Sequence, residues 1–186
     1  MSFLIPVQGS GDSFRKAEEA YMRGNYTTAL KEWTPVAEQG DLTSQINLAN
    51  MYRKGKGFLQ NYKIAVKRYI LPAEHGNALA QYNLGIMYSF VLGVLQEYKT
   101  SVKWYTLSAK QGDTCAEYNL GRLYYLVQGV TEDIVYTHMW TSSASSNGFE
   151  MSENLKGLLK EQMTLSQIEK AQALAKECDA KNHKGC

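Results

Sequence analysis

The sequence predicts an all-α fold, an α-solenoid built from helical hairpins, and three observations support this prediction. Four glycines lie 36 residues apart in related phrases such as "AEQGD", "AEHGN" and "AKQGD": Gly40, Gly76, Gly112 and Gly148. Other positions recur at the same period: Leu48, Leu84 and Leu120; Tyr52, Tyr88 and Tyr124; Gly57, Gly93 and Gly129; Ala73 and Ala109; and the aromatic set Trp33, Tyr69 and Tyr105. The apolar residues between the glycines follow helical spacing. A fixed period of this size indicates stacked units, because one unit cannot bury its apolar face alone.

The first unit is the shortest. In "YMRGNYTTALKEW" the aromatic residue follows Tyr21 by twelve residues, whereas Tyr52 and Tyr69 of the next unit are seventeen apart. The loop between its two helices has therefore lost about one helical turn. This unit is predicted to be a compact helical hairpin.

Each later unit is predicted to contain two helices. "ALAQYNLGIMYSF" places Ala80, Leu84 and Tyr88 at helical spacing, and "YKTSVKWYTLSAKQ" does the same for Val102 and Tyr105. The second helix begins after a loop that carries one repeated glycine. A polar residue favourable for the helix dipole stands at that point: Asn61, Glu97 and Asp133.

The repeated glycine phrase is predicted to end one helix and to start the next. Glycine suits the left-handed backbone that follows a helix C-terminus. The residues after three of these glycines, Asp41, Asn77 and Asp113, are good N-caps. A phrase of five residues therefore serves as the joint between successive units.

After Gly148 the repeat stops, and two further helices are expected to cover the open end. Thr164 followed by Gln167 forms a capping-box pattern at the start of the last helix. Leu165, Ile168, Ala171, Leu174 and Ala175 would lie on its apolar side. The expected organisation is a flexible segment at 1–12, four repeats at about 13–40, 41–76, 77–112 and 113–148 (together 13–148), capping helices at 149–181 and a frayed tail at 182–186.

Composition excludes several classes of partner. The 186 residues carry a formal net charge of +2 with the signs interspersed, which gives no electrostatic footprint for nucleic acid. No stretch approaches the roughly 18 apolar residues that a spanning helix needs, so membrane insertion is not expected. "MSFLIPVQGS" lacks a basic n-region and makes a poor secretory signal. Three cysteines are too few for a disulfide framework, and whether Cys178 and Cys186 pair stays open.

The repeats resemble the Sel-1-like repeat family, a relative of the tetratricopeptide repeat with a longer internal loop. "AQYNLGIMY...LGVLQEYKTSVKWYTLSAKQGD" carries the resemblance most clearly, then "AEYNLGRLYYLVQGVTED". It covers about 13–148, and "MTLSQIEKAQALA" resembles the closing helix of bacterial members. Two features depart from the pattern: Gly55 becomes Val91 and Val127 in later loops, and "THMWTSSASSNG" replaces alanines by serines and threonine.

The resemblance implies a right-handed superhelix that binds a protein or peptide on its concave face and carries out no catalysis. A role in bacterial host interaction or envelope signalling follows from the likeness to bacterial members. A periplasmic or secreted location is therefore favoured, with the cytoplasm as the alternative. A monomer is expected.

Motifs that could carry chemistry are weak. "SFRK", from Ser13 to Lys16, matches the nucleophile pattern of β-lactam-binding enzymes, but no K-T-G follows, so a hydrolase is only the alternative. Cys178, His183 and Cys186 lack a zinc spacing, and no metal or cofactor is expected.

Two histidines and one cysteine complete the chemical candidates. His75 and His138 have no catalytic partner placed by the sequence and are assigned structural roles. Cys115 stands near a helix start, where it is either a small, partly buried residue or a thiol whose pKa the helix N-terminus lowers.

The candidate partner surface is a row along the first helices of the repeats. If these helices line the inner curve, the row consists of Asn47, Asn50, Lys54, Asn83, Ile86, Phe90, Asn119 and Arg122, continued by Leu126. Amide groups can hydrogen-bond an extended peptide, and Arg122 can hold a carboxylate or a phosphate. The alternative is that the asparagines bond across to the next repeat and stabilise the stack.

A second candidate surface is the loop "SFVLGV". Phe90, Val91, Leu92 and Val94 crowd a loop that is polar in the preceding unit. Either the fourth unit covers them, or they form an apolar patch through which the chain associates with itself or a partner.

Overall fold

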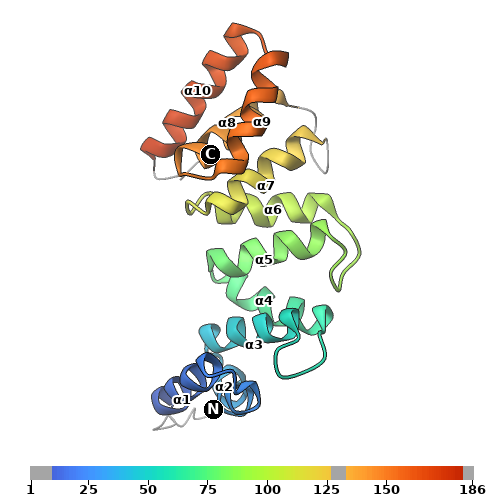
Figure 1. The fold of residues 1–186 in the computed structure, drawn as a ribbon, viewed down its shortest axis with the longest axis vertical. Coiled ribbons are helices and arrows are strands. Elements are labelled where there is room, and N and C mark those ends of the chain that lie inside the picture. The colour runs from blue at the N-terminus through green and yellow to red at the C-terminus, as the bar shows by residue number, and fades with distance from the viewer. Residues whose placement is uncertain (1–9, 127–132, 182–186) are drawn as a thin grey trace, which may run out of the picture. The chain divides into compact units, whose positions relative to one another are not determined.

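The computed structural model describes residues 10–126 and 133–181. These residues form ten helices and no strand, which confirms the all-α prediction (Figure 1). The helices are α1 (Ser10–Met22), α2 (Tyr26–Glu38), α3 (Leu42–Lys54), α4 (Tyr62–Glu74), α5 (Ala78–Ser89), α6 (Tyr98–Ala109), α7 (Thr114–Tyr125), α8 (Ile134–Ser146), α9 (Glu150–Gln162) and α10 (Leu165–Ala180).

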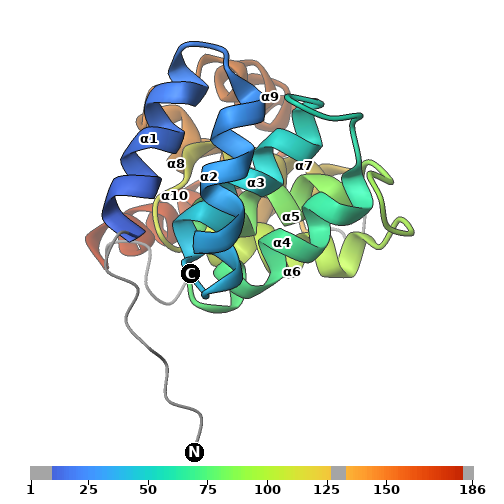
Figure 2. The same cartoon turned by 90° about the horizontal axis from the view of Figure 1, so that it is seen from below.

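The chain divides into two compact units, Met1–Pro72 and Ala73–Cys186, called unit 1 and unit 2 below. In unit 1, α2 packs against both α1 and α3 (Figure 2). Its core centres on Trp33, which is 3% exposed and lies beside Phe14 and Tyr21. The loop after α3 folds back onto the first hairpin, where the Lys56 ammonium lies 4.9 Å from the centre of the Tyr21 ring.

In unit 2, each helix packs against the next from α5 to α9, and α10 returns to α8. One core cluster includes Tyr105, Leu120 and Trp140, and α10 contributes Ala175 and Cys178 to it. A second cluster joins Leu159 of α9 to α8 and α10. The last helix therefore covers the end of unit 2, as its apolar pattern predicts, although Leu165 is 71% exposed and not part of the buried face.

The predicted caps are present. The side chains of Asp41, Asn77 and Asp113 accept hydrogen bonds from the backbone N–H groups three residues on, and the glycine before each has positive φ. Asp133 caps α8 in the same way, whereas Glu97 makes no such bond at α6. At the start of α10, the backbone N–H of Thr164 donates to Gln167 Oε1, and that of Gln167 donates to Thr164 Oγ1.

The two helices of the third hairpin approach so closely that only glycine fits between them. A Cβ atom at Gly85 of α5 would lie 2.5 Å from a ring carbon of Tyr105 on α6. The ring therefore rests directly on the backbone of α5. In the fourth hairpin, a Cβ at Gly121 would lie 2.8 Å from Thr141.

The sequence predicts a flexible segment at 1–12 and a frayed tail at 182–186. Helix α1 begins at Ser10, so residues 10–12 of the N-terminal segment expected at 1–12 belong to this helix. The remainder of the expected N-terminal segment, the expected tail at 182–186 with His183 and Cys186, and Val127 lie outside the described residues.

Candidate functional site

The predicted partner row is divided between the two units. Asn47, Asn50 and Lys54 belong to unit 1 and the other five residues to unit 2. Of the first three, Lys54 is exposed, while Asn47 and Asn50 are half-buried. Asn50 accepts a hydrogen bond of 2.7 Å from the Tyr69 hydroxyl, so its amide oxygen serves the packing of the second repeat.

The asparagines of unit 2 bond within their own helices. Asn83 is 3% exposed, and its Nδ2 donates to the Leu79 carbonyl over 2.8 Å. Asn119 Nδ2 donates to the Cys115 carbonyl over the same distance. Both amide nitrogens therefore donate within their own helix, and Asn83 is buried whereas Asn119 is half-buried.

Glutamines, which the sequence analysis did not single out, make the bonds between helices of successive repeats. Gln45 of α3 donates to the Ala37 carbonyl of α2, and Gln81 of α5 donates to the Ala73 carbonyl of α4. The 36-residue spacing of Gln45 and Gln81 could have identified this position. At the third occurrence stands Glu117, a fully buried carboxylate that accepts from the Ser143 hydroxyl of α8 instead.

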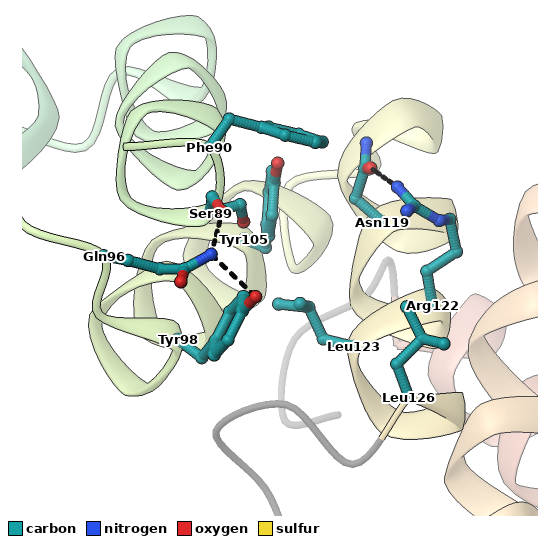
Figure 3. A pocket seen from close by; sticks show the side chains of 9 residues that line it. All are labelled: Ser89, Phe90, Gln96, Tyr98, Tyr105, Asn119, Arg122, Leu123 and Leu126. Atoms are coloured by element: carbon teal, nitrogen blue, oxygen red, sulfur yellow. Dashed lines mark hydrogen bonds between the residues drawn. The ribbon is translucent and has the colours of Figure 1, made fainter. Parts of the chain in front are cut away.

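A pocket of about 180 Å³ lies in unit 2 among α5, α6 and α7. It contains three members of the predicted row together with residues that the row did not include (Figure 3). Its lining residues are Ser89, Phe90, Gln96, Tyr98, Tyr105, Asn119, Arg122, Leu123 and Leu126. The structure thus brings Phe90, Asn119 and Arg122 together at one cavity, below called the Tyr105 pocket.

The hydroxyl of Tyr105 is the unusual group of this pocket. The residue is 1% exposed, and its hydroxyl forms no hydrogen bond within the described part of the chain. The neighbouring Ser89 hydroxyl is engaged with Ser101 at 2.5 Å. A buried hydroxyl without a partner loses free energy relative to water, on the order of 1–3 kcal/mol. Figure 3 shows this hydroxyl directed toward Phe90 and the side where Asn119 lies.

Arg122 supplies the positive charge of the pocket. One of its guanidinium nitrogens donates to Asn119 Oδ1 over 3.3 Å, which orients the group. Among the described residues, no carboxylate lies within ion-pair distance of Arg122. Gln96 closes the opposite wall, where its Nε2 bridges the Ser89 carbonyl and the Tyr98 hydroxyl.

Arg122 and Leu126 also line a second cavity, a groove of about 410 Å³ between α7 and α9. The other residues of this α7–α9 groove are Tyr118, Tyr125, Met151, Asn154, Leu155 and Leu158. Several of its apolar side chains are open to solvent, with Leu126 46%, Met151 58% and Leu158 52% exposed. The donor-lined pocket and the apolar groove therefore adjoin each other at two shared residues.

The other candidates for chemistry do not form a site. Burial and the Asp113 carboxylate raise the pKa of the Cys115 thiol, which opposes formation of a thiolate and favours the alternative of a small, partly buried residue. His138 is fully buried, and its Nδ1 lies 3.1 Å from the Ser142 hydroxyl. Across residues 10–126 and 133–181, no group of three His, Cys, Asp or Glu side chains is arranged to hold a metal ion.

The "SFVLGV" loop is not fully covered by the fourth repeat. Phe90 and Val91 are 53% and 54% exposed, whereas Leu92 and Val94 are half-buried. Of the two alternatives for this loop, an open apolar patch therefore describes Phe90 and Val91. Phe90 also lines the Tyr105 pocket. In the part of the chain that the structure describes, no helix combines the length and apolar character needed to cross a bilayer.

Comparisons with known proteins agree with this architecture. The family model described as Sel1 repeat matches residues 42–76, 78–113 and 116–149. The crystal structure of c5321, described as a protective antigen present in uropathogenic Escherichia coli with an SLR fold, is 28% identical with a TM-score of 0.83. The similarity extends over 94% of this chain but over only 38% of c5321. This chain is thus similar to little more than a third of the length of that protein.

A Sel1 repeat protein from Oxalobacter formigenes is 25% identical with a TM-score of 0.74, over 90% of this chain and 77% of the other. No curated protein sequence matches the chain. Members of the Sel1 repeat family generally act as scaffolds for protein–protein interaction and are typically not enzymes. Because the three matched segments span more than half of its length and coincide with the observed helical hairpins, the chain belongs to the Sel1 repeat family.

Proposed function

We propose that this protein binds a segment of a partner protein on the surface of α7, with the α7–α9 groove as the principal contact. The observation that carries the proposal is the exposure of Leu126, Met151 and Leu158 along one groove. Apolar side chains gathered in a concave surface of a repeat protein are a typical partner site. Within the predicted row, Asn119 and Arg122 lie on α7, and Phe90 lines the adjoining Tyr105 pocket.

The setting of this interaction is proposed to be the bacterial envelope or contact with a host. The support is the similarity to c5321, which is described as a protective antigen of uropathogenic strains. This similarity spans 38% of that protein, so the proposal concerns the kind of surroundings and not the partner itself.

The binding proposal can be tested by selecting random peptides displayed on phage against the immobilised chain. Peptides enriched on the native protein are then measured by fluorescence anisotropy against a Met151→Asp, Leu158→Asp variant. We expect the affinity to fall at least tenfold, because two charges in the groove oppose burial of apolar side chains.

A matched control is Leu165→Asp, which places the same charge on a side chain that is 71% exposed and outside the groove. It should bind as the native chain does. Enrichment of no peptide, or equal loss in both variants, would overturn the assignment of the groove.

A further inference from the structure

We propose that the Tyr105 pocket is a binding site for a carboxylate side chain, Asp or Glu, of the partner segment. This inference rests on the proposed function and names the chemistry that the partner must bring. It goes beyond an apolar contact, because it predicts which polar group stands next to the apolar residues of the segment.

The first step of the argument is the unpartnered hydroxyl of Tyr105. The residue is buried to 1% exposure and is one of those that line the pocket, and its hydroxyl, directed toward Phe90 in Figure 3, has no hydrogen-bond partner in the described residues. Burial raises the pKa of this phenol, so the hydroxyl keeps its proton and remains a donor at any physiological pH. A pocket that contains a buried hydrogen-bond donor without a partner suits a ligand that carries an acceptor.

The second step is the repeat position itself. In the preceding repeat, Tyr69 holds the same place, and its hydroxyl donates to Asn50. The residue equivalent to Asn50 is Ile86, which has no acceptor. The replacement of an amide by an aliphatic side chain removes the internal partner of Tyr105 and leaves the hydroxyl for a ligand.

The third step is the charge. Arg122 lines the same pocket, has no carboxylate partner among the described residues and is oriented by Asn119. A guanidinium and a neutral hydroxyl together offer donors to the two oxygens of a carboxylate. Among the described residues of the lining, Arg122 is the one that carries a charge, so a single carboxylate group is enough to balance it.

The fourth step is that the Tyr105 pocket adjoins the α7–α9 groove. Arg122 and Leu126 belong to both cavities, so a chain whose acidic side chain enters the pocket can lay apolar side chains into the groove. The pocket volume of about 180 Å³ accommodates one side chain and not a folded element. The partner segment is therefore acidic at one position and apolar beside it.

The experiment uses glutarate as the probe and its neutral diamide, glutaramide, as the matched control. Both are titrated into the ¹⁵N-labelled full chain at constant ionic strength. We expect glutarate, but not glutaramide, to shift the Arg122 Nε–H signal and the backbone amides near Ser89 and Asn119. Equal shifts from both compounds, or tighter binding of phenyl phosphate than of glutarate, would overturn the assignment.

Three variants locate the site. Arg122→Gln should weaken glutarate binding roughly ten- to a hundredfold, and Tyr105→Phe roughly threefold to tenfold, because a charged and a neutral hydrogen bond are lost. Ile86→Asn should also weaken binding, because its amide gives Tyr105 the partner that Asn50 gives Tyr69. Thermal unfolding monitors folding, and a folded Arg122→Gln variant with native glutarate affinity would contradict the proposal.

The failure of this inference can be told apart from failure of the proposed function. If the affinity of the selected peptides depends on Met151 and Leu158 but not on Arg122, the groove binds partners and the proposal of a carboxylate site is wrong. If glutarate binds at Arg122 while no peptide is enriched, the carboxylate site is supported and the assignment of the groove as a partner site is wrong.

Discussion

Tyr69 and Tyr105 occupy the same position in successive repeats, one in unit 1 and one in unit 2, yet their hydroxyls meet different surroundings. Tyr69 donates to Asn50, and burial raises its pKa to about 12. Tyr105 is as deeply buried but has no partner in the described residues and faces a pocket. The comparison teaches that a repeated residue can serve packing in one repeat and remain open for binding in the next.

A second difference accompanies the first. Gly85 lies against the Tyr105 ring in unit 2, and the residue 36 positions earlier, in unit 1, is Ala49. Since a Cβ atom at Gly85 would lie 2.5 Å from the Tyr105 ring, the ring in unit 2 is seated where alanine does not fit. The place of the Tyr105 pocket thus depends on a glycine as well as on the missing amide.

The largest effect is expected from Gly85→Ala, which removes this difference between the units. The added methyl group forces the Tyr105 ring to move, and we expect unfolding free energy to fall by about 2 kcal/mol, as for other overpacked sites. Urea denaturation followed by circular dichroism measures it. The matched control is Gly157→Ala on α9, where nothing lies within 4 Å, and it should stabilise by about 0.5–1 kcal/mol.

The next effect comes from removing each hydroxyl in turn. Tyr69→Phe should lower the unfolding free energy by about 1 kcal/mol, because it breaks the bond to Asn50. Tyr105→Phe should leave it unchanged or raise it by up to about 1 kcal/mol, because it removes an unpartnered buried hydroxyl. Equal losses in both variants, measured by urea denaturation, would mean that Tyr105 has an internal partner after all.

The two units should also respond differently to acid. Unit 1 contains no histidine, whereas unit 2 contains His138, whose pKa is lowered by burial and by Lys156 and Lys160. The native state therefore disfavours protonation of His138. The contribution of the neutral imidazole to the unfolding free energy is fully present above the ordinary histidine pKa of about 6.5 and is lost as the pH falls below that value. Hydrogen exchange should show helix α8 losing protection between about pH 7 and pH 5.

His138→Asn provides the control for this acid response. It keeps a polar group near Ser142 but does not titrate, so the difference in exchange between the two pH values should disappear. An acid response that persists in this variant would assign it to carboxylates instead.

The smallest effect is expected at the C-termini of the first helices. Gly55 has φ of 65° in unit 1, and its counterpart Val91 has φ of 59° in unit 2, a left-handed backbone that a β-branched residue adopts at a cost. Val91→Gly removes this strain but gives the unfolded chain more freedom, so we expect a net gain of about 0.5 kcal/mol. Urea denaturation should show this gain, and a loss would indicate that the exposed Val91 side chain packs usefully.

The repeat, the helices and most caps could be predicted because they depend on local chemistry. Asp41, Asn77 and Asp113 cap helices through the backbone three residues on, whatever the rest of the chain does. Of the residues that line the Tyr105 pocket, the predicted row included Phe90, Asn119 and Arg122 but not Tyr105, which the sequence showed only as one of three aromatic residues that recur at the repeat period. It also placed Asn83 on an open row, whereas the residue is buried.

The sequence by itself determined a repeat of paired helices, joined by glycine and a capping residue, since period, spacing and caps are properties of neighbouring residues. Only the tertiary structure decided which polar groups are satisfied: Tyr69 by Asn50, Glu117 by Ser143, and Tyr105 by nothing in the described residues. The physical reason is that a hydrogen bond between helices depends on a side chain distant in sequence and on helix separation. A single change, Asn50 to Ile86 at one repeat position, alters that outcome without altering the pattern of the fold.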